Sequence, residues 1–183
     1  MDATPHPSCW SRRAFLLSAG TSVTTVLLTG PMALAAAKKG RAPALRVVGY
    51  PAVKVGRVSQ LKVDTPVFFQ YPGKDFNSTN ALVRLGVPAG GGVGPDRDIV
   101  AFNNLCTHMG GPLQGTYKAA HKVLGPCPFH LTTFDLTRHG IVVAGQATES
   151  LPQVVLDVRG DDLYATGMMG LIYGYANNLA AVR

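Results

Sequence analysis

The chain has 183 residues and a formal net charge of +7 at pH 7, from 17 Lys and Arg against 10 Asp and Glu. This length suits one well-buried domain. The basic residues are scattered rather than clustered with aromatic side chains, which argues against a nucleic-acid-binding protein, whereas a basic surface suits an acidic redox partner. The 21 Gly and 13 Pro favour an all-β protein over a helical bundle.

The N-terminal residues 1–37 are predicted to be an export signal. Ser11-Arg12-Arg13-Ala14-Phe15-Leu16 is similar to a twin-arginine motif, and an uncharged stretch continues to Ala37. Ala33-Leu34-Ala35 offers the small residues that a signal peptidase needs. The stretch also exceeds the roughly 20 residues that span a bilayer, so cleavage and retention as a membrane anchor are both compatible with it. The motif predicts export of the folded protein to the periplasm.

Residues 38–183 read as short apolar runs separated by turn residues, which predicts an antiparallel β architecture. The glycine-rich segment 87–95 has no following Gly-Lys-Ser/Thr, so we expect a flexible hairpin loop and not a phosphate-binding loop. Residues from about 103 to 147 are expected to form a smaller subdomain set into a larger β base. The expected strands and apolar runs are 45–48, 53–55, 67–71, 81–85, 99–103, 122–124, 132–136, 141–143, 154–158 and 163–166.

Two short motifs each supply one cysteine and one histidine: Cys106-Thr-His108 and Cys127-Pro-Phe-His130. Two thiolates and two imidazoles are the ligands of a Rieske [2Fe–2S] cluster, with the cysteines on one iron and the histidines on the other. A structural zinc site uses the same ligands, but zinc fingers usually pair cysteine with cysteine and histidine with histidine. Core residues without a metal are the remaining alternative. The other cysteine, Cys9, lies in the export signal. His6, His121 and His139 are expected to be surface residues and not ligands.

The wider loops, Cys-Thr-His-Met-Gly-Gly-Pro-Leu and Gly-Pro-Cys-Pro-Phe-His-Leu, resemble the two cluster-binding loops of Rieske proteins. The resemblance covers residues 38–183. It implies a Rieske-type antiparallel β-sandwich or barrel base with a smaller cluster-binding β subdomain. It also implies one-electron transfer through a [2Fe–2S] cluster, with the two histidines at the tip of the protein. The implied ligands are Cys106, His108, Cys127 and His130.

Within these proteins, the chain looks most similar to the small Rieske subunit of arsenite oxidase. The twin-arginine signal, the first ligand loop and the stretch 145–154 leading to 161–167 carry this resemblance. It implies a large molybdopterin and iron–sulfur subunit that oxidises arsenite and passes electrons through this chain to a cytochrome c or a cupredoxin. This chain itself shows no nucleophile or acid–base site. Two alternatives are a quinol-oxidising Rieske subunit of a membrane cytochrome bc complex and a zinc-stabilised binding module.

Quinol-oxidising relatives carry two further cysteines, whose disulfide links the ligand loops. This chain has Gly111 and Phe129 there, so the resemblance implies no bridge, and Phe129 is expected to fill part of the space as an apolar lid. Thr132 stands at the usual serine position and keeps a hydroxyl for cluster sulfur. Phe134 stands at the usual tyrosine position and has no hydroxyl. Since hydrogen bonds to sulfur favour the reduced cluster, we expect a potential below that of these relatives and above that of all-cysteine ferredoxins.

Overall fold

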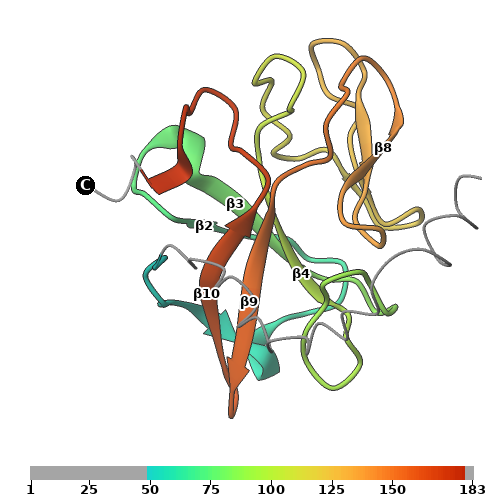
Figure 1. The fold of residues 1–183 in the computed structure, drawn as a ribbon. Coiled ribbons are helices and arrows are strands. Elements are labelled where there is room, and N and C mark those ends of the chain that lie inside the picture. The colour runs from blue at the N-terminus through green and yellow to red at the C-terminus, as the bar shows by residue number, and fades with distance from the viewer. Residues whose placement is uncertain (1–48, 180–183) are drawn as a thin grey trace, which may run out of the picture. The chain divides into compact units, whose positions relative to one another are not determined.

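The computed structural model describes residues 49–179, and these form two antiparallel β-sheets, as predicted (Figure 1). The predicted export signal and the apolar run at 45–48 lie outside the described residues. Short 3₁₀ helices occur at Val58–Gln60 and Phe76–Ser78. Within residues 49–179, no helix combines the length and the apolar character that crossing a membrane requires.

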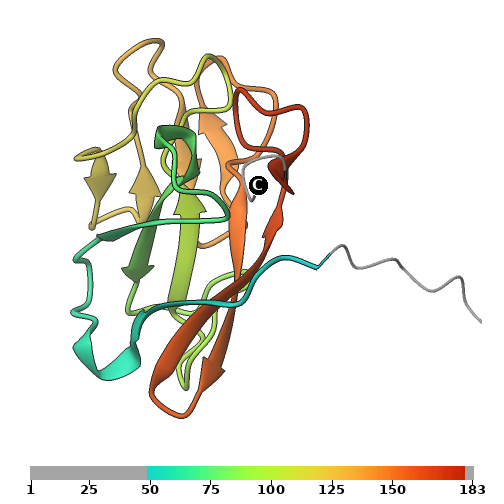
Figure 2. The same cartoon turned by 90° about the vertical axis from the view of Figure 1, so that its left-hand side faces the viewer.

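The larger sheet has six strands in the order β1-β10-β9-β4-β3-β2, and all neighbours are antiparallel. Figure 2 shows the long β9–β10 hairpin beside the central strands. Every residue of β4 is buried. The strands are β1 (Val53–Arg57), β2 (Val67–Gln70), β3 (Thr79–Arg84), β4 (Ile99–Asn103), β9 (Gln153–Arg159) and β10 (Asp162–Met169).

Strands β3 and β4 divide the core into two clusters, because successive side chains of a strand point to opposite faces. On one face, Leu82, Ile99 and Ala101 pack with residues of the larger sheet and of the segments that adjoin its strands. On the other face, Val100 and Phe102 join a cluster that also holds apolar residues of the smaller sheet and both Cys106 and Cys127. Burial of β4 on both faces therefore fixes the smaller sheet against the larger one.

The smaller sheet has the order β5-β6-β7-β8. Its strands have only two to four residues, so much of the chain between them is loop. The sequence did not predict the two-residue strand β5. The strands are β5 (Tyr117–Lys118), β6 (Val123–Leu124), β7 (Thr133–Asp135) and β8 (Ile141–Ala144).

The glycine-rich segment 87–95 lies in the connection between β3 and β4 and is bound to its surroundings. The amide of Gly90 donates to the carbonyl of Thr137 (2.8 Å), and its carbonyl accepts from Nε2 of Gln153 (2.9 Å). The His139 ring packs so closely that a Cβ at Gly90 would lie 2.5 Å from it. The segment is therefore a hairpin loop tied to the β7–β8 turn, and the flexibility that we predicted has no support here. His139 itself is exposed, as predicted.

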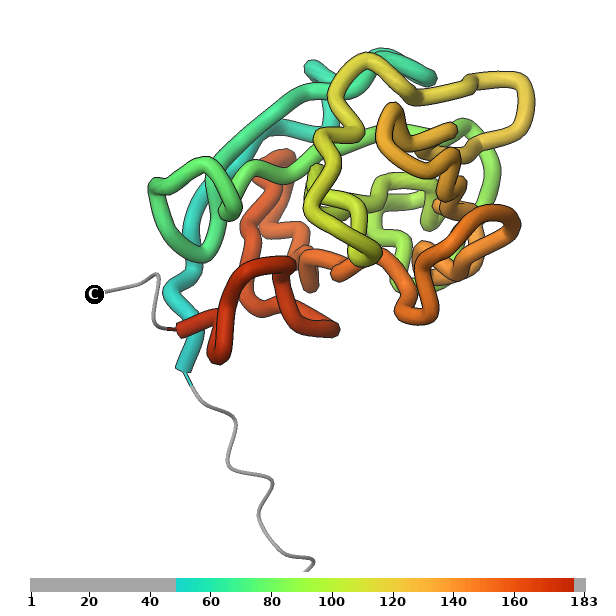
Figure 3. Tube along the Cα trace, turned by 90° about the horizontal axis from the view of Figure 1, so that it is seen from above, coloured from blue at the N-terminus to red at the C-terminus, as the bar shows by residue number. Residues whose placement is uncertain are grey.

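Residues 170–179 follow β10 and run beside the loop that begins after β4. Figure 3 shows this red segment next to the yellow-green loop. It folds into a compact turn because the side-chain oxygen of Asn178 accepts from the amide of Ile172 (2.9 Å) and its nitrogen donates to the carbonyl of Gly170 (2.8 Å). Ile172 is fully buried and fixes the turn to the domain.

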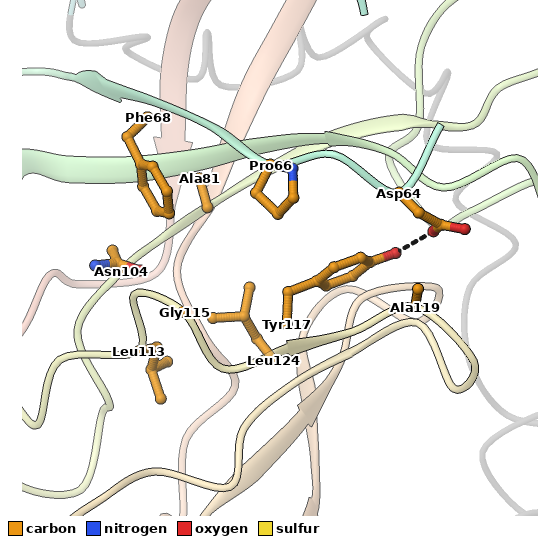
Figure 4. A pocket seen from close by; sticks show the side chains of 10 residues that line it. All are labelled: Asp64, Pro66, Phe68, Ala81, Asn104, Leu113, Gly115, Tyr117, Ala119 and Leu124. Atoms are coloured by element: carbon orange, nitrogen blue, oxygen red, sulfur yellow. Dashed lines mark hydrogen bonds between the residues drawn. The ribbon is translucent and has the colours of Figure 1, made fainter. Parts of the chain in front are cut away.

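An ion pair joins the two sheets at one edge. Asp64, just before β2, accepts a hydrogen bond from the hydroxyl of Tyr117 (2.6 Å) and pairs with Nζ of Lys122 (2.7 Å). The hydrogen bonds from Lys122 and then Tyr117 lower the pKa of Asp64. Asp64 and Tyr117 lie at one end of a pocket of about 330 Å³, and Phe68 lines its other end (Figure 4).

We expect Lys122→Met to lower the free energy of unfolding by about 1 kcal/mol at pH 7, the order of magnitude of a partly screened ion pair with a hydrogen bond. The folded-state pKa of Asp64 is lowered, so its contribution is present above the unfolded pKa of about 4 and is lost as the pH falls through the folded value. Urea unfolding measured from pH 7 to pH 3 should show the free energies of unfolding of wild type and Lys122→Met becoming equal as the pH falls. Lys118→Met removes an exposed lysine of β5 as the control. A loss of stability that does not change with pH would contradict the ion pair.

Candidate iron–sulfur site

The two ligand loops share one backbone pattern. The amide of Cys106 donates to the carbonyl of Gly111, five residues on (2.9 Å), and its carbonyl accepts from the amide of Gly110, four residues on (2.8 Å). The amide of Cys127 likewise donates to the carbonyl of Thr132 (2.8 Å), and its carbonyl accepts from the amide of Leu131 (2.9 Å). Each loop therefore curls over its own cysteine, and its histidine lies within the turn that the two hydrogen bonds close.

This turn requires a left-handed backbone at the fourth position after each cysteine. Gly110 has φ +67° and Leu131 has φ +62°. Glycine adopts this conformation readily, whereas leucine is strained in it. The second loop therefore holds a strained residue next to a predicted ligand, as is common at functional sites.

The structure arranges the predicted ligands as two pairs, with the thiols inside and the imidazoles outside. Cys106 and Cys127 are each 1% exposed and belong to the same buried core cluster. His108 is half-buried and His130 is exposed, with ring centroids 4.7 Å apart and ring planes at 81°. A cluster with cysteines on the inner iron and histidines on the outer iron fits this arrangement.

A single zinc ion and a binuclear cluster place different demands on these ligands. Tetrahedral zinc needs four ligands around one point. In the part of the chain that the structure describes, no three His, Cys, Asp or Glu side chains converge to hold a single ion. A binuclear cluster takes only two protein ligands on each iron, so the two pairs fit it.

Burial raises the pKa of the Cys106 thiol, and the neighbouring Cys127 raises it further. Hydrogen bonds from the backbone amide of His108 and from the Thr132 hydroxyl act in the opposite direction. These two donors favour a charged sulfur at a site where burial alone would favour the neutral thiol. They are thus placed to stabilise negative charge on a metal-bound thiolate.

Gly111 has no room for a side chain. A Cβ there would lie 2.6 Å from Sγ of Cys127 and 3.1 Å from the Phe129 ring. The Phe129 ring thus covers Gly111 while standing edge-on to His130, with centroids 6.4 Å apart. Phe129 is 56% exposed, so it is only a partial lid.

A third segment, which the motifs did not predict, ties the two ligand loops together. The buried hydroxyl oxygen of Thr132, in the second loop, accepts from the amides of Gln146 (3.1 Å) and Ala147 (3.3 Å). In the first loop, the hydroxyl of Thr107 donates to the carbonyl of Glu149 (2.8 Å). Residues 146–149 thereby link loops that no disulfide joins. A local signal was Gly145, where φ is +100° and a Cβ would lie 2.3 Å from Cα of Thr132.

Phe134 of β7 is fully buried in the core cluster that contains both predicted cysteine ligands. We expect Phe134→Tyr to raise the reduction potential by about 40 mV, since one new hydrogen bond to sulfur is worth about 1 kcal/mol and a tenfold change in a one-electron equilibrium is 59 mV. A redox titration followed by circular dichroism measures this shift. Phe102→Tyr adds the same hydroxyl to the same core cluster from β4 and serves as the control. An unchanged potential for Phe134→Tyr would count against the mechanism.

Comparison with known proteins agrees with this site. Residues 52–155 match the Rieske [2Fe-2S] domain family. The chain is 62% identical over 173 residues to iodate reductase subunit IdrB of Denitromonas iodatirespirans, covering 94% of this chain and 89% of that protein. It is 56% identical over 168 residues to iodate reductase subunit IdrB of Pseudomonas sp. (strain SCT), covering 92% and 84%. The soluble domain of the Rieske protein II (soxF) from Sulfolobus acidocaldarius has a TM-score of 0.62 at 26% identity, covering 71% and 84%.

The predicted membership of the arsenite oxidase small subunits is wrong, because the relatives that match almost the whole chain are subunits of iodate reductase. The misleading features were the first ligand loop and the stretch that starts at Gly145. Both surround the predicted cluster site, so they report on the cofactor and not on a substrate that another chain transforms. The chain belongs to the Rieske [2Fe–2S] family, and it is an electron-transfer protein with a Rieske-type [2Fe–2S] cluster.

Proposed function

We propose that this protein is the electron-delivering subunit of an iodate reductase. The observation that carries the proposal is its identity of 62% and 56%, over more than nine-tenths of the chain, with two subunits of that enzyme. A reductase consumes electrons, so they flow from a soluble carrier through this chain to a catalytic partner. This direction is opposite to the one that the arsenite oxidase resemblance implied.

The chemistry of iodate requires such a partner. Removal of one oxygen follows IO₃⁻ + 2H⁺ + 2e⁻ → IO₂⁻ + H₂O, whereas a Rieske cluster, when bound, supplies one-electron exchange. The catalytic subunit must therefore collect two electrons before each removal. We assign that task to a large molybdopterin and iron–sulfur subunit, because oxygen-atom removal in two-electron steps suits a molybdenum centre.

The residues around the predicted ligands favour a docking face at the imidazole side. Met109, Phe129 and Leu131 stand in or beside the two motifs and are 53%, 56% and 66% exposed. Exposed apolar side chains that gather in one place mark protein–protein contacts. His108 and His130 lie in the same loops, so a partner that covers these side chains would come close to the imidazole edges.

The electron carrier is proposed to be a cytochrome c or a cupredoxin with an acidic face, since the net charge of +7 attracts acidic proteins. The twin-arginine motif at Arg12 and Arg13 supports a periplasmic location. This motif lies outside the described residues.

The decisive experiment uses the native complex, purified without oxygen and reduced with one equivalent of dithionite. Iodate should remove the electron paramagnetic resonance signal of the reduced cluster within the turnover time of the complex. The isolated subunit with the same iodate concentration controls for direct chemical oxidation. Equal reoxidation rates with and without the partner would overturn the proposal. So would co-purification with a membrane cytochrome b in place of a molybdopterin subunit.

A further inference from the structure

The C-terminal segment 170–179, which we call the clasp, is fastened to the chain just before β3. Nδ2 of Asn77 donates to the carbonyl of Tyr173 (3.2 Å). The hydroxyl of Tyr175 bonds to the carboxylate of Asp75 and to the hydroxyl of Ser78, at 3.0 Å from the latter. Together with the buried Ile172, these contacts fix the path of the clasp over several residues and not at a single point.

The clasp lies against the first ligand loop through one aromatic ring. A Cβ at Gly110 would be 2.5 Å from Cδ1 and Cε1 of Tyr173, so the ring packs directly on the α-carbon of this glycine. Gly110 is the residue whose amide closes the loop onto the carbonyl of Cys106. The ring therefore lies against the residue whose amide closes the loop that presents His108.

The anchor of the clasp is also connected to the start of this loop. The side chain of Asn103 donates to the carbonyl of Asn77 (2.8 Å) and accepts from the amide of Leu105 (3.1 Å). The amide of Asn104 donates to the carbonyl of Thr79 (2.9 Å). The segment that holds the clasp thus also holds the beginning of the ligand loop, so the ring and the loop keep a fixed separation.

We propose that Tyr173 is a positioning residue that keeps the first ligand loop closed around the cluster. The loop has no disulfide to hold it, and a loop without such a link opens by local unfolding. A packed ring over Gly110 excludes water from the closing hydrogen bond and lowers the population of the open loop. The proposal rests on the cluster and on the assignment of Cys106 and His108 as ligands, and it is independent of iodate and of the partner.

The test measures loss of the cluster from the loaded full-length chain. Wild type and variants are mixed anaerobically with bathophenanthroline disulfonate, and iron release is followed by absorbance. Tyr173→Ala should release iron about fivefold faster or more, because the loss of one packed contact raises the open population by a factor of that order. Tyr173→Phe keeps the ring and should behave like wild type. Leu171→Ala removes an apolar side chain of the same segment that is 54% exposed, and should also behave like wild type.

Two further readouts separate positioning from general stability. The urea midpoint of unfolding should be the same for Tyr173→Ala and Leu171→Ala, while the g-values of the reduced cluster should change in Tyr173→Ala alone. If Tyr173→Ala does not load with iron, Asn77→Ala takes its place. This variant loosens the anchor of the clasp but keeps the Tyr173 ring, so we expect it to release iron at a rate between those of wild type and Tyr173→Ala. Release from both Tyr173→Ala and Asn77→Ala at the rate of Leu171→Ala would overturn the proposal. Iron release from Tyr173→Phe as fast as from Tyr173→Ala would also overturn it.

Discussion

Alanine at His108 or at His130 is expected to abolish the visible and electron paramagnetic resonance spectra of the Rieske cluster. The two imidazole rings stand edge to face with centroids 4.7 Å apart, outside the buried thiols, so each replacement would leave one iron with a single protein ligand. Both residues lie in loops and not in the strands that build the core. Far-ultraviolet circular dichroism should therefore remain that of a β protein.

His121→Ala is the matched control for these variants. His121 is an exposed histidine, and its backbone amide bonds to the carbonyl of Lys118 in the smaller sheet. Its replacement should leave iron content and spectra unchanged. A full complement of iron in His108→Ala or His130→Ala, or loss of iron in His121→Ala, would contradict the ligand assignment.

Thr132→Val is expected to lower the free energy of unfolding by about 2 kcal/mol, because valine leaves a buried amide without its acceptor. Thr132 is fully buried, and its hydroxyl oxygen accepts from the amides of Gln146 and Ala147. The same hydroxyl lowers the pKa of the Cys106 thiol, so it favours negative charge on this sulfur. Its removal should also lower the reduction potential by about 40 mV, the equivalent of about 1 kcal/mol in a one-electron couple.

Urea unfolding and a redox titration measure the two effects, and two variants serve as controls. Thr132→Ser keeps the hydroxyl and should have the reduction potential of the wild type. Thr133→Val makes the same chemical change at the next residue, the first of β7, where the hydroxyl makes only a 3.4 Å contact with the carbonyl of Leu131. Equal effects at Thr132 and Thr133 would show that neither hydroxyl acts on the cluster.

The site is compatible with either direction of electron flow. The loops, the core and the hydrogen-bond donors hold a one-electron centre, and none of them selects between taking electrons from a catalytic subunit and giving electrons to it. Arsenite oxidation and iodate reduction therefore place the same requirements on this chain. This explains why the sequence patterns identified the cofactor but led to the wrong family of enzymes.

Most of the strands could be predicted because their pattern is local. The expected strands at 99–103 and 154–158 agree with β4 and β9 to within one residue at each end. Strand β5 was missed because a two-residue strand has no recognisable alternation of apolar residues. The glycine-rich segment was expected to be flexible, because its composition does not reveal the bonds that it makes with Thr137 and Gln153.

By itself, the sequence determined the all-β class and the Cys/His motifs that predict the cluster. Alternation along a strand and ligand spacing within a loop are both set by neighbouring residues. Only the tertiary structure decided how the loops are held. The Thr107–Glu149 bond joins residues 42 apart in the chain, and the contact of Tyr173 with Gly110 spans a still longer separation. Contacts of this kind depend on how β4 and the smaller sheet pack together, and packing across the fold has no periodicity that a single sequence can display.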